Sequence, residues 1–204
     1  MNVSKKSKSD SVLLSKTVSI DPRIEKVLVT KQEVDDGCIK AAQWINKNYK
    51  NKSLLLVGIL KGCITFMGRL IPLINLDLEV DFMTISSFRG HTHAVSAPKI
   101  VMDLSTDVKD YDVLLVEDII DAGYTTNKVI ELLKLRGAKS IGLITFLDKY
   151  EARKVNVPID YACYQVPDKF VVGFGIDYQE KFRNLPYIGY LKKAVIEKME
   201  KQRK

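Results

Sequence analysis

The eleven-residue segment Val116–Thr126 (VEDIIDAGYTT) holds the residue types best suited to chemistry. Two carboxylates, Glu117 and Asp118, end an apolar run, and a third, Asp121, precedes small and hydroxyl-bearing residues. Small residues let backbone N–H groups surround an anion, and the helix expected next would present its N-terminus there. The carboxylates would repel a bare phosphate, but they suit ribose hydroxyls and a Mg²⁺ held by oxygen ligands. The segment therefore predicts a site for a sugar phosphate with a divalent metal. A plain strand–turn–helix with solvated acids and an aspartate cap is the alternative; a P-loop is excluded because GxxxxGK[ST] is absent.

Apolar runs and alternating patterns predict the elements that position this segment. Five segments are predicted as strands: Ser53–Ile59, Leu78–Phe88, Lys99–Leu104, Asp112–Val116 and Ser140–Leu147. Three are predicted as helices: Val34–Tyr49 after a capping box at Thr30–Glu33, Gly62–Ile74, and Thr125–Leu135 closed by Gly137. Strands and helices alternate, which indicates an α/β fold with a mostly parallel twisted sheet flanked by helices.

The pattern changes beyond Asp148 to three short strands. They are Asp160–Val166, Phe170–Ile176 and Tyr187–Tyr190, and we expect them to form a small antiparallel hood lobe beside the main sheet. No linker is visible, so residues 21–191 are predicted to form one domain that includes this lobe. Residues 1–20 are interpreted as a basic, mobile arm and residues 192–204 as a basic tail.

The net charge of +7 lies at the two ends of the chain. Residues 1–20 contain four lysines and one aspartate, and residues 192–204 contain six basic and two acidic residues. The body between them is formally neutral. A neutral body with basic ends is weak support for a nucleic-acid face, so we interpret the ends as solvated and predict no nucleic-acid partner.

The apolar runs and the cysteines bear on the location of the protein. No run approaches about 18 apolar residues, and the first residues lack the apolar core of a signal peptide, so no membrane partner is expected. The widely spaced Cys38, Cys63 and Cys163 form no CxxC pair, so neither a disulfide framework nor a zinc site is indicated. A cytoplasmic location is the default expectation.

The string VLLVEDIIDAGYTT resembles the phosphoribosyl-diphosphate motif of the type I phosphoribosyltransferases, and their hypoxanthine-guanine branch is the closest match. The resemblance covers roughly residues 24–191. It implies that Glu117 and Asp118 face the ribose hydroxyls and Mg²⁺. It also implies that the 5′-phosphate is held by Asp121, Ala122, Gly123, Tyr124 and Thr125. Asp121 matches the aspartate near purine N7, where it would be the catalytic proton acceptor.

Two lysines fall in further stretches that resemble this family. Gly58–Gly62 (GILKG) is similar to its pyrophosphate loop, which uses Lys61 and Gly62 and in which the Leu–Lys peptide can be cis. A plain strand-to-helix turn is the alternative there. Lys149, in FLDKY, matches the lysine that hydrogen-bonds the purine 6-oxo group, and a cation at that point would select 6-oxopurines over adenine. An exposed loop lysine is the alternative.

Two downstream stretches complete the implied site. In PDKFVVG, the resemblance has Phe170 stack on the base while the Val171 backbone reads the purine edge; alone, Phe170 would be a core residue. The stretch GIDYQEKFR resembles the family's LDYNExxR. There Asp177 would hold a second Mg²⁺ and Arg183 would contact pyrophosphate through its forked donors. A surface turn with an Asp–Arg pair is the alternative.

One departure from the family pattern concerns the flexible loop over the site. That loop usually begins Ser-Tyr, and here Ser87 is followed by Phe88, which removes one hydroxyl donor. This puts loop closure and turnover rate in question. His91 and His93 follow in a polar stretch, His91–Pro98, and are interpreted as loop residues rather than metal ligands.

The resemblance implies transfer of a phosphoribosyl group to hypoxanthine or guanine, with Mg²⁺ as cofactor and 5-phosphoribosyl 1-diphosphate as the other substrate. It also implies a homo-oligomer, a dimer or a tetramer. Xanthine or uracil in place of these bases is an alternative. A non-catalytic sensor that binds nucleic acid is a second alternative. Such a protein would need an added helix-turn-helix or a basic face on residues 21–191.

Overall fold

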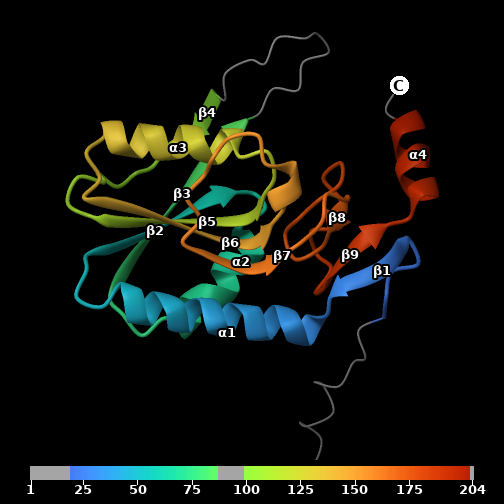
Figure 1. Ribbon diagram of the computed structural model, residues 1–204, viewed down its shortest axis with the longest axis horizontal. Coiled ribbons are helices and arrows are strands. Elements are labelled where there is room, and N and C mark those ends of the chain that lie inside the picture. The colour runs from blue at the N-terminus through green and yellow to red at the C-terminus, as the bar shows by residue number, and fades with distance from the viewer. Residues whose placement is uncertain (1–18, 87–98, 203–204) are drawn as a thin grey trace, which may run out of the picture.

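The computed structural model describes residues 19–86 and 99–202 (Figure 1). The residues assigned to the flexible loop, Ser87 and Phe88, lie outside the described residues, as does the predicted loop at 91–98. The prediction of a mobile arm falls on residues of which only the last two are described.

A six-stranded sheet forms the centre of the molecule (Figure 1). Its strands, in order across the sheet, are β4 (Lys99–Met102), β3 (Leu78–Ser86), β2 (Leu54–Leu60), β5 (Asp112–Ile120), β6 (Ser140–Asp148) and β7 (Tyr161–Gln165). All neighbouring pairs are parallel except β3 with β4, which is antiparallel. The predicted mostly parallel sheet is confirmed.

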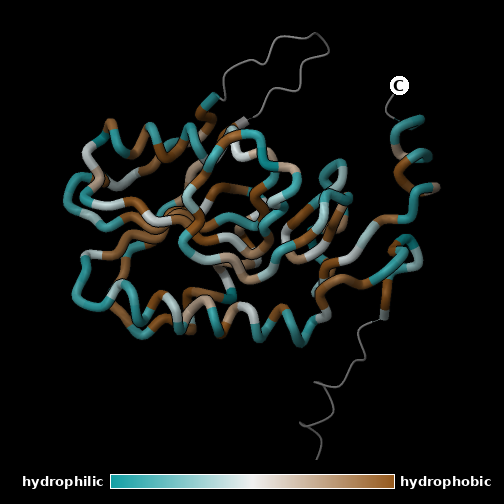
Figure 2. Tube along the Cα trace, in the orientation of Figure 1, coloured by the Kyte–Doolittle hydropathy of each residue, from teal (hydrophilic) through white to brown (hydrophobic). Residues whose placement is uncertain are grey.

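Alternate side chains of the buried strands build two cores on opposite faces of the sheet. In β2, Leu54 and Leu56 join a cluster with α1 (Lys31–Asn48) and α2 (Ile64–Leu70). The intervening Leu55 and Val57 join a second cluster with α3 (Tyr124–Leu135). Helices therefore cover both faces, and the apolar strands lie between them (Figure 2). Burial on both faces is why these strands are continuous apolar runs rather than alternating ones.

Local signals set the limits of the helices. Thr30 and Glu33 form the predicted capping box at the start of α1, with the Thr30 hydroxyl accepting from the Glu33 N–H at 3.2 Å. The predicted helix 62–74 is divided into α2 and a 3₁₀ turn, η2 (Ile71–Leu73), where Pro72 lacks an N–H to continue the α-helix. Gly137, with φ +78°, follows the end of α3 as predicted.

A second, three-stranded antiparallel sheet forms the hood lobe. Its order is β1 (Ile24–Val29), β9 (Ile188–Leu191) and β8 (Val171–Val172). The prediction of a hood lobe is confirmed, but one of its three predicted strands lies elsewhere and one of its actual strands was not predicted. β7 lies in the main sheet, parallel to β6, although the connection between them contains only a 3₁₀ turn, η3 (Tyr150–Ala152). The strand that completes the hood, β1, comes from the N-terminal side and is absent from the predicted elements.

The predicted basic tail folds as a helix over most of its length. Helix α4 (Lys193–Lys201) buries Met199 in the hood cluster with Ile24, Phe182 and Leu191. Val195 and Ile196 share that face of the helix, so apolar spacing rather than charge determines the structure here. Within the described residues, no helix is long and apolar enough to span a membrane.

Candidate active site

The predicted site segments converge at the carboxyl ends of three neighbouring parallel strands. β2 ends at Leu60, β5 at Ile120 and β6 at Asp148. The pairing of Ile120 with Asp148 brings two of these ends together directly, and β2 runs beside β5 in register. Ligands of open α/β sheets bind at this edge, where loops lead into helices.

The turn after β5 has the geometry of an anion site. Gly123 adopts φ +88° and directly precedes α3, whose first turn has no side-chain cap. The alternative with an aspartate cap is therefore wrong, and among residues 19–86 and 99–202 no side chain accepts from the first backbone N–H groups of α3. Thr125 is half-buried and Tyr124 is exposed at this helix end. Free N–H groups at a helix N-terminus favour a bound anion such as phosphate.

The two carboxylates at the end of β5 face different neighbours, as consecutive strand residues must. Glu117 is buried, and its carboxylate accepts a hydrogen bond from the Thr126 hydroxyl at 3.2 Å. Burial, with a contribution from Asp118, raises the pKa of Glu117 well above its ordinary value. Asp118 lies against Gly62, where a Cβ would collide with the carboxylate. Glu117 and Asp118 therefore do not present their two carboxylates on one common face of the strand.

The charge of Asp118 is only partly compensated by its surroundings. Burial raises the pKa of Asp118 to about 6, against hydrogen bonds from backbone N–H groups that lower it. The positive charge of Arg183 also lowers this pKa, and the negative charge of Asp177 raises it. These last two effects show that Asp118 and both hood residues are close enough to interact through their charges.

Lys149 lies at the end of β6 between two carboxylates. Its side chain is 8% exposed, and the ammonium contacts Asp168 Oδ1 at 3.1 Å and Asp121 Oδ2 at 3.5 Å. The two carboxylates are themselves well exposed, at 58% and 60%. The alternative of an exposed loop lysine is therefore wrong. A nearly buried cation beside two accessible acids can donate to a polar ligand group at this edge.

A network of charges joins the hood to the loop after β2. The Arg183 guanidinium contacts Asp177 Oδ1 at 2.8 Å and donates to the Gly175 carbonyl at 2.8 Å. Glu180 accepts from Lys61 at 3.1 Å and lies 3.3 Å from Arg183, and the Lys61 hydrogen bond is the largest cause of its lowered pKa. The Asp–Arg pair of the alternative interpretation therefore exists, and it lies within the predicted site.

The loop after β2 packs closely against both the sheet and the hood. The Leu60–Lys61 peptide is cis, as the family resemblance suggested. Gly175, with φ +96°, leaves no room for a Cβ because the Gly62 carbonyl oxygen lies beside it. Two glycines thus let the hood backbone, this loop and the Asp118 carboxylate meet.

The hood also carries the two residues predicted to bind the base. Phe170 is 58% exposed, with its ring 5.7 Å from Tyr178 in an edge-on arrangement, so the core alternative is wrong. An exposed aromatic face is available for stacking on a planar ligand. Val171 is buried in β8 and paired with Tyr190, so only its backbone can read a ligand edge.

Sequence reasoning missed four residues of this region: Asp148, Arg153, Asp168 and Glu180. Asp148 and Asp168 lie inside the strings FLDKY and PDKFVVG, and an acid beside each lysine was the available signal. Glu180 occupies the glutamate position of the LDYNExxR stretch, so the motif was its available signal, and it also lies three residues from Arg183. Arg153 carries no comparable signal for its contact with the turn, because it binds a backbone carbonyl 32 residues away.

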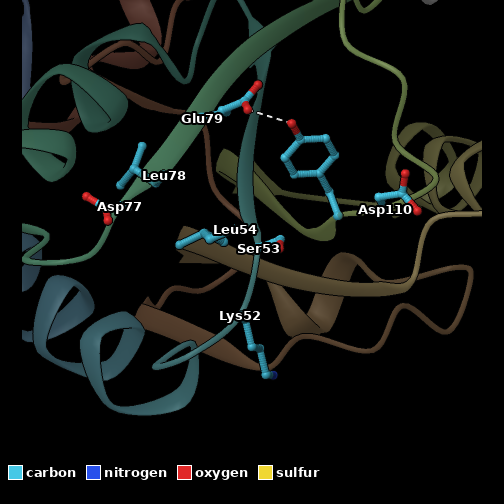
Figure 3. A pocket seen from close by; sticks show the side chains of 8 residues that line it. Lys52, Ser53, Leu54, Asp77, Leu78, Glu79 and Asp110 are labelled. Carbon is cyan, nitrogen blue, oxygen red and sulfur yellow. Dashed lines mark hydrogen bonds between the residues drawn. The ribbon is translucent and has the colours of Figure 1, made fainter.

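A separate cavity of about 510 Å³ lies at the opposite edge of the sheet (Figure 3). Its walls come from the starts of β2 and β3 and the residues before β5, including Asp77, Glu79 and Asp110. Tyr111 donates to Glu79 at 2.5 Å across it. Since the predicted residues lie at the strand ends, this cavity is not part of the candidate site.

The fold and this edge define an α/β protein with a glycine turn before an uncapped helix, a nearly buried lysine and a hood beside the carboxyl ends of the sheet. Residues 26–179 match the family described as phosphoribosyl transferase domain. The chain belongs to this family, which confirms the resemblance found in the sequence.

Individual relatives agree with the family assignment. The chain is 45% identical over 166 residues to the hypoxanthine-guanine phosphoribosyltransferase of Mycoplasma genitalium, covering 81% of this chain and 95% of the relative. It is 44% identical over 180 residues to the enzyme of the same name from Lactococcus lactis, covering 88% and 98%. A crystal structure of a hypoxanthine phosphoribosyltransferase from Staphylococcus aureus superimposes with a TM-score of 0.81 at 40% identity, over 85% and 94% of the two chains.

Proposed function

We propose that this protein is a purine-salvage enzyme that transfers the 5-phosphoribosyl group of phosphoribosyl diphosphate to hypoxanthine or guanine, giving IMP or GMP and pyrophosphate. The names of its relatives and the family match support this activity. The observation that carries it is the Lys149 ammonium, nearly buried beside Asp121 and one strand away from the anion-binding turn. A base held by Lys149 would lie next to a sugar phosphate held by that turn.

The sugar phosphate is the first ligand to account for. We assign its 5′-phosphate to the backbone N–H groups and hydroxyls of residues 121–125, where Gly123 and the uncapped end of α3 provide donors. Asp118 is the carboxylate that faces the loop after β2 and suits the ribose hydroxyls. Glu117 would not contact the ribose directly. It would act through the hydrogen bond that it accepts from Thr126.

The purine is the second ligand. Lys149 would donate to the 6-oxo group, and adenine would be rejected because its 6-amino group is a donor facing a donor. Phe170 has an exposed ring that can stack on the base, and the Val171 backbone can read its edge. Nothing in these contacts separates guanine from xanthine at the 2-position, so xanthine stays an alternative.

The reaction breaks the bond between ribose C1 and the diphosphate oxygen and forms a bond from C1 to purine N9. The departing diphosphate keeps the electron pair. The Lys61 backbone and the Arg183 guanidinium would bind it, since the forked donors of arginine suit phosphate oxygens. The base loses its N7 proton, and Asp121, 60% exposed and next to Lys149, is placed to accept it.

Magnesium is the proposed cofactor, and the donor set fits it. Asp118 and Asp177 repel each other enough to affect the pKa of Asp118, and a divalent cation would relieve that repulsion. Among the described residues, no three metal-ligating side chains are grouped together. Mg²⁺ commonly takes one or two carboxylates plus substrate phosphates and water, so two are sufficient. When bound, the ion would supply positive charge to the leaving diphosphate.

The decisive experiment is a steady-state assay with hypoxanthine, guanine, xanthine and adenine, each with and without Mg²⁺. We expect magnesium-dependent formation of IMP and GMP and no reaction with adenine. The variant Lys149→Gln should raise the KM for hypoxanthine while leaving the KM for phosphoribosyl diphosphate nearly unchanged. Activity with adenine alone would overturn the role of Lys149.

Three further assignments are proposals that rest on sequence and family resemblance. The domain is taken as residues 21–191 with the hood included. A cytoplasmic location and a dimeric or tetrameric assembly follow the expectations from the sequence. Size-exclusion chromatography with light scattering would test the assembly.

A further inference from the structure

Arg153 contacts the turn after β5, which is the proposed phosphate site. It follows η3, and its guanidinium Nε donates to the Asp121 carbonyl at 3.0 Å. Its aliphatic stem lies under Gly123, where a Cβ would fall 3.1 Å from Arg153 Cδ. The other end of the guanidinium pairs with Asp148, which is 8% exposed at the end of β6. Arg153 therefore joins the turn after β5 to the end of β6.

The carbonyl that Arg153 binds belongs to the same planar peptide as the Ala122 N–H. In a trans peptide the C=O and N–H groups point in opposite directions. Holding the Asp121 carbonyl outward on Arg153 therefore holds the Ala122 N–H inward. Without that donor this peptide could rotate and withdraw its N–H from the anion.

The next peptide is held in the same way by the residues after Arg153. The Ala122 carbonyl accepts from the backbone N–H groups of Lys154 at 3.0 Å and Val155 at 3.1 Å. This peptide carries the Gly123 N–H, which is thereby also turned inward. Residues 153–155 thus bind the carbonyls of two successive peptides, and the N–H groups of these peptides point away from residues 153–155, where they can meet the proposed phosphate.

We infer that Arg153 is a positioning residue for the 5′-phosphate: it touches no substrate, but it fixes the turn in the form that binds one. The inference rests on the proposed function, since it takes the turn at 121–125 as the phosphate site. Preorganised N–H donors bind an anion without the cost of ordering the loop at each binding event. Removing Arg153 should therefore weaken binding of the phosphorylated substrate and affect the purine much less.

The test compares Arg153→Met and Arg153→Lys by steady-state kinetics. Arg153→Met keeps the stem and removes the donor, so the KM for phosphoribosyl diphosphate should rise about tenfold, the usual worth of one charge-assisted hydrogen bond. The KM for hypoxanthine should change less than about threefold. Arg153→Lys keeps the charge but cannot bind both Asp121 and Asp148, so it should be intermediate. Binding of ribose 5-phosphate by calorimetry should weaken in parallel.

Two further variants separate positioning from charge and from folding. Lys128→Ala removes one exposed positive charge near the start of α3 and should leave both KM values unchanged. Arg153→Met leaves Asp148 nearly buried and unpaired, which can destabilise the fold. The double variant Asp148→Asn with Arg153→Met removes that orphan charge. It should recover the unfolding midpoint while the KM for phosphoribosyl diphosphate stays high.

The outcomes distinguish this inference from the proposed function. A wild-type protein without phosphoribosyl transfer would overturn the proposed function. An active wild type whose Arg153→Met variant keeps its KM for phosphoribosyl diphosphate would overturn the inference alone. Wild-type kinetics in Arg153→Lys would show that charge and not bonding geometry matters, and equal rises in both KM values would show a general structural role. Either result also overturns it.

Discussion

Single residues at this site differ in how their charges are balanced. The Lys149 ammonium has two carboxylates within 3.5 Å, so its near-burial is offset by direct partners. In the part of the chain that the structure describes, the negative charge of Asp118 is offset by the more distant charge of Arg183 and by backbone N–H groups, and its pKa is raised in spite of them. A group that the fold leaves unbalanced is one that a ligand can balance, which is why Asp118 is the more informative of the two.

The proton acceptor can be tested by replacing Asp121 with asparagine. The side-chain carbonyl of the new amide can still accept a hydrogen bond from Lys149, which lies 3.5 Å from the present carboxylate, so purine binding should persist. Turnover should fall roughly 10²–10⁴-fold, the usual contribution of a general base, with KM values changed much less. Asp168→Asn is the matched control, since it contacts the same ammonium, and it should lower turnover by no more than about tenfold. Unchanged turnover in Asp121→Asn would rule out this role.

The raised pKa of Asp118 predicts a pH-dependent stability. Its ordinary value is 3.8, and burial raises it to about 6 in the folded protein. Between these two pKa values the unfolded chain has released the proton while the folded chain still keeps it. The unfolding free energy therefore falls as the pH rises, and the loss is complete above the pKa of the folded protein. Asp118→Asn removes the titrating carboxyl and with it this loss of stability. Compared with wild type, the variant should gain about 1–3 kcal/mol of unfolding free energy between about pH 4 and pH 8.

Urea denaturation of both proteins at several pH values would measure this difference. Glu117→Gln is the related control, because its carboxyl is also buried and its pKa is also raised. It should shift stability in the same direction. A difference between Asp118→Asn and wild type that does not change with pH would contradict the assignment.

At the scale of elements, the sequence correctly predicted the strands and helices whose own residues show a clear signal, such as an apolar run or a capping box. β2, β5 and β6 are apolar runs because both of their faces are covered, and α1 has its capping box. β1 was missed because only its two end residues are fully buried, so IEKVLV gives neither a run nor a clean alternation. The direction of β7 was wrong because a parallel connection normally contains a helix, and here it contains one 3₁₀ turn.

The limits of prediction at the site have the same cause. The motif at 116–126 located Asp121 and Gly123, and the stretch FLDKY located Lys149. The roles proposed for these residues depend on residue type and on their position at the ends of strands. Arg153 was missed because its partner on the turn is a carbonyl oxygen 32 residues away, and every residue type offers a carbonyl. Contacts to backbone atoms depend on the folded path of the chain and leave no mark in the sequence of the partner.

Two helical glycines offer a matched test of packing at the scale of elements. Gly68, in α2, has no atom within 4 Å of an added Cβ, so Gly68→Ala should stabilise the protein by about 0.5–1 kcal/mol. Gly37, in α1, would place a Cβ 3.0 Å from Tyr164 and 3.2 Å from Phe146. The higher helix propensity of alanine is then opposed by overpacking, and Gly37→Ala should destabilise the protein by about 1 kcal/mol. Chemical denaturation measures both, and an equal effect would show that the α1–β7 contact is loose.

At the scale of the whole molecule, the site lies between a sheet with two cores and a hood with a third. The sheet brings the turn at 121–123 and Lys149, and the hood brings Phe170, Asp177 and Arg183. The hood is made of short strands from both ends of the described chain, β1 and β9, so it depends on contacts far apart in sequence. Its stability therefore bears directly on the ligand contacts proposed for Phe170, Val171, Asp177 and Arg183.

Helix α4 provides a way to change the hood without touching a proposed ligand residue. Met199 is 8% exposed and packs in the cluster with Phe182, Tyr187 and Leu191. Met199→Ala should lower the unfolding free energy by about 1–3 kcal/mol, toward the low end for a core methionine because it lies at the rim of a small cluster. Lys198→Ala, on the exposed face of the same helix, should change it by less than about 0.5 kcal/mol. If residues 192–204 behaved instead as a solvated tail, the two variants would be equally stable, and that result would contradict the docking of α4 on the hood.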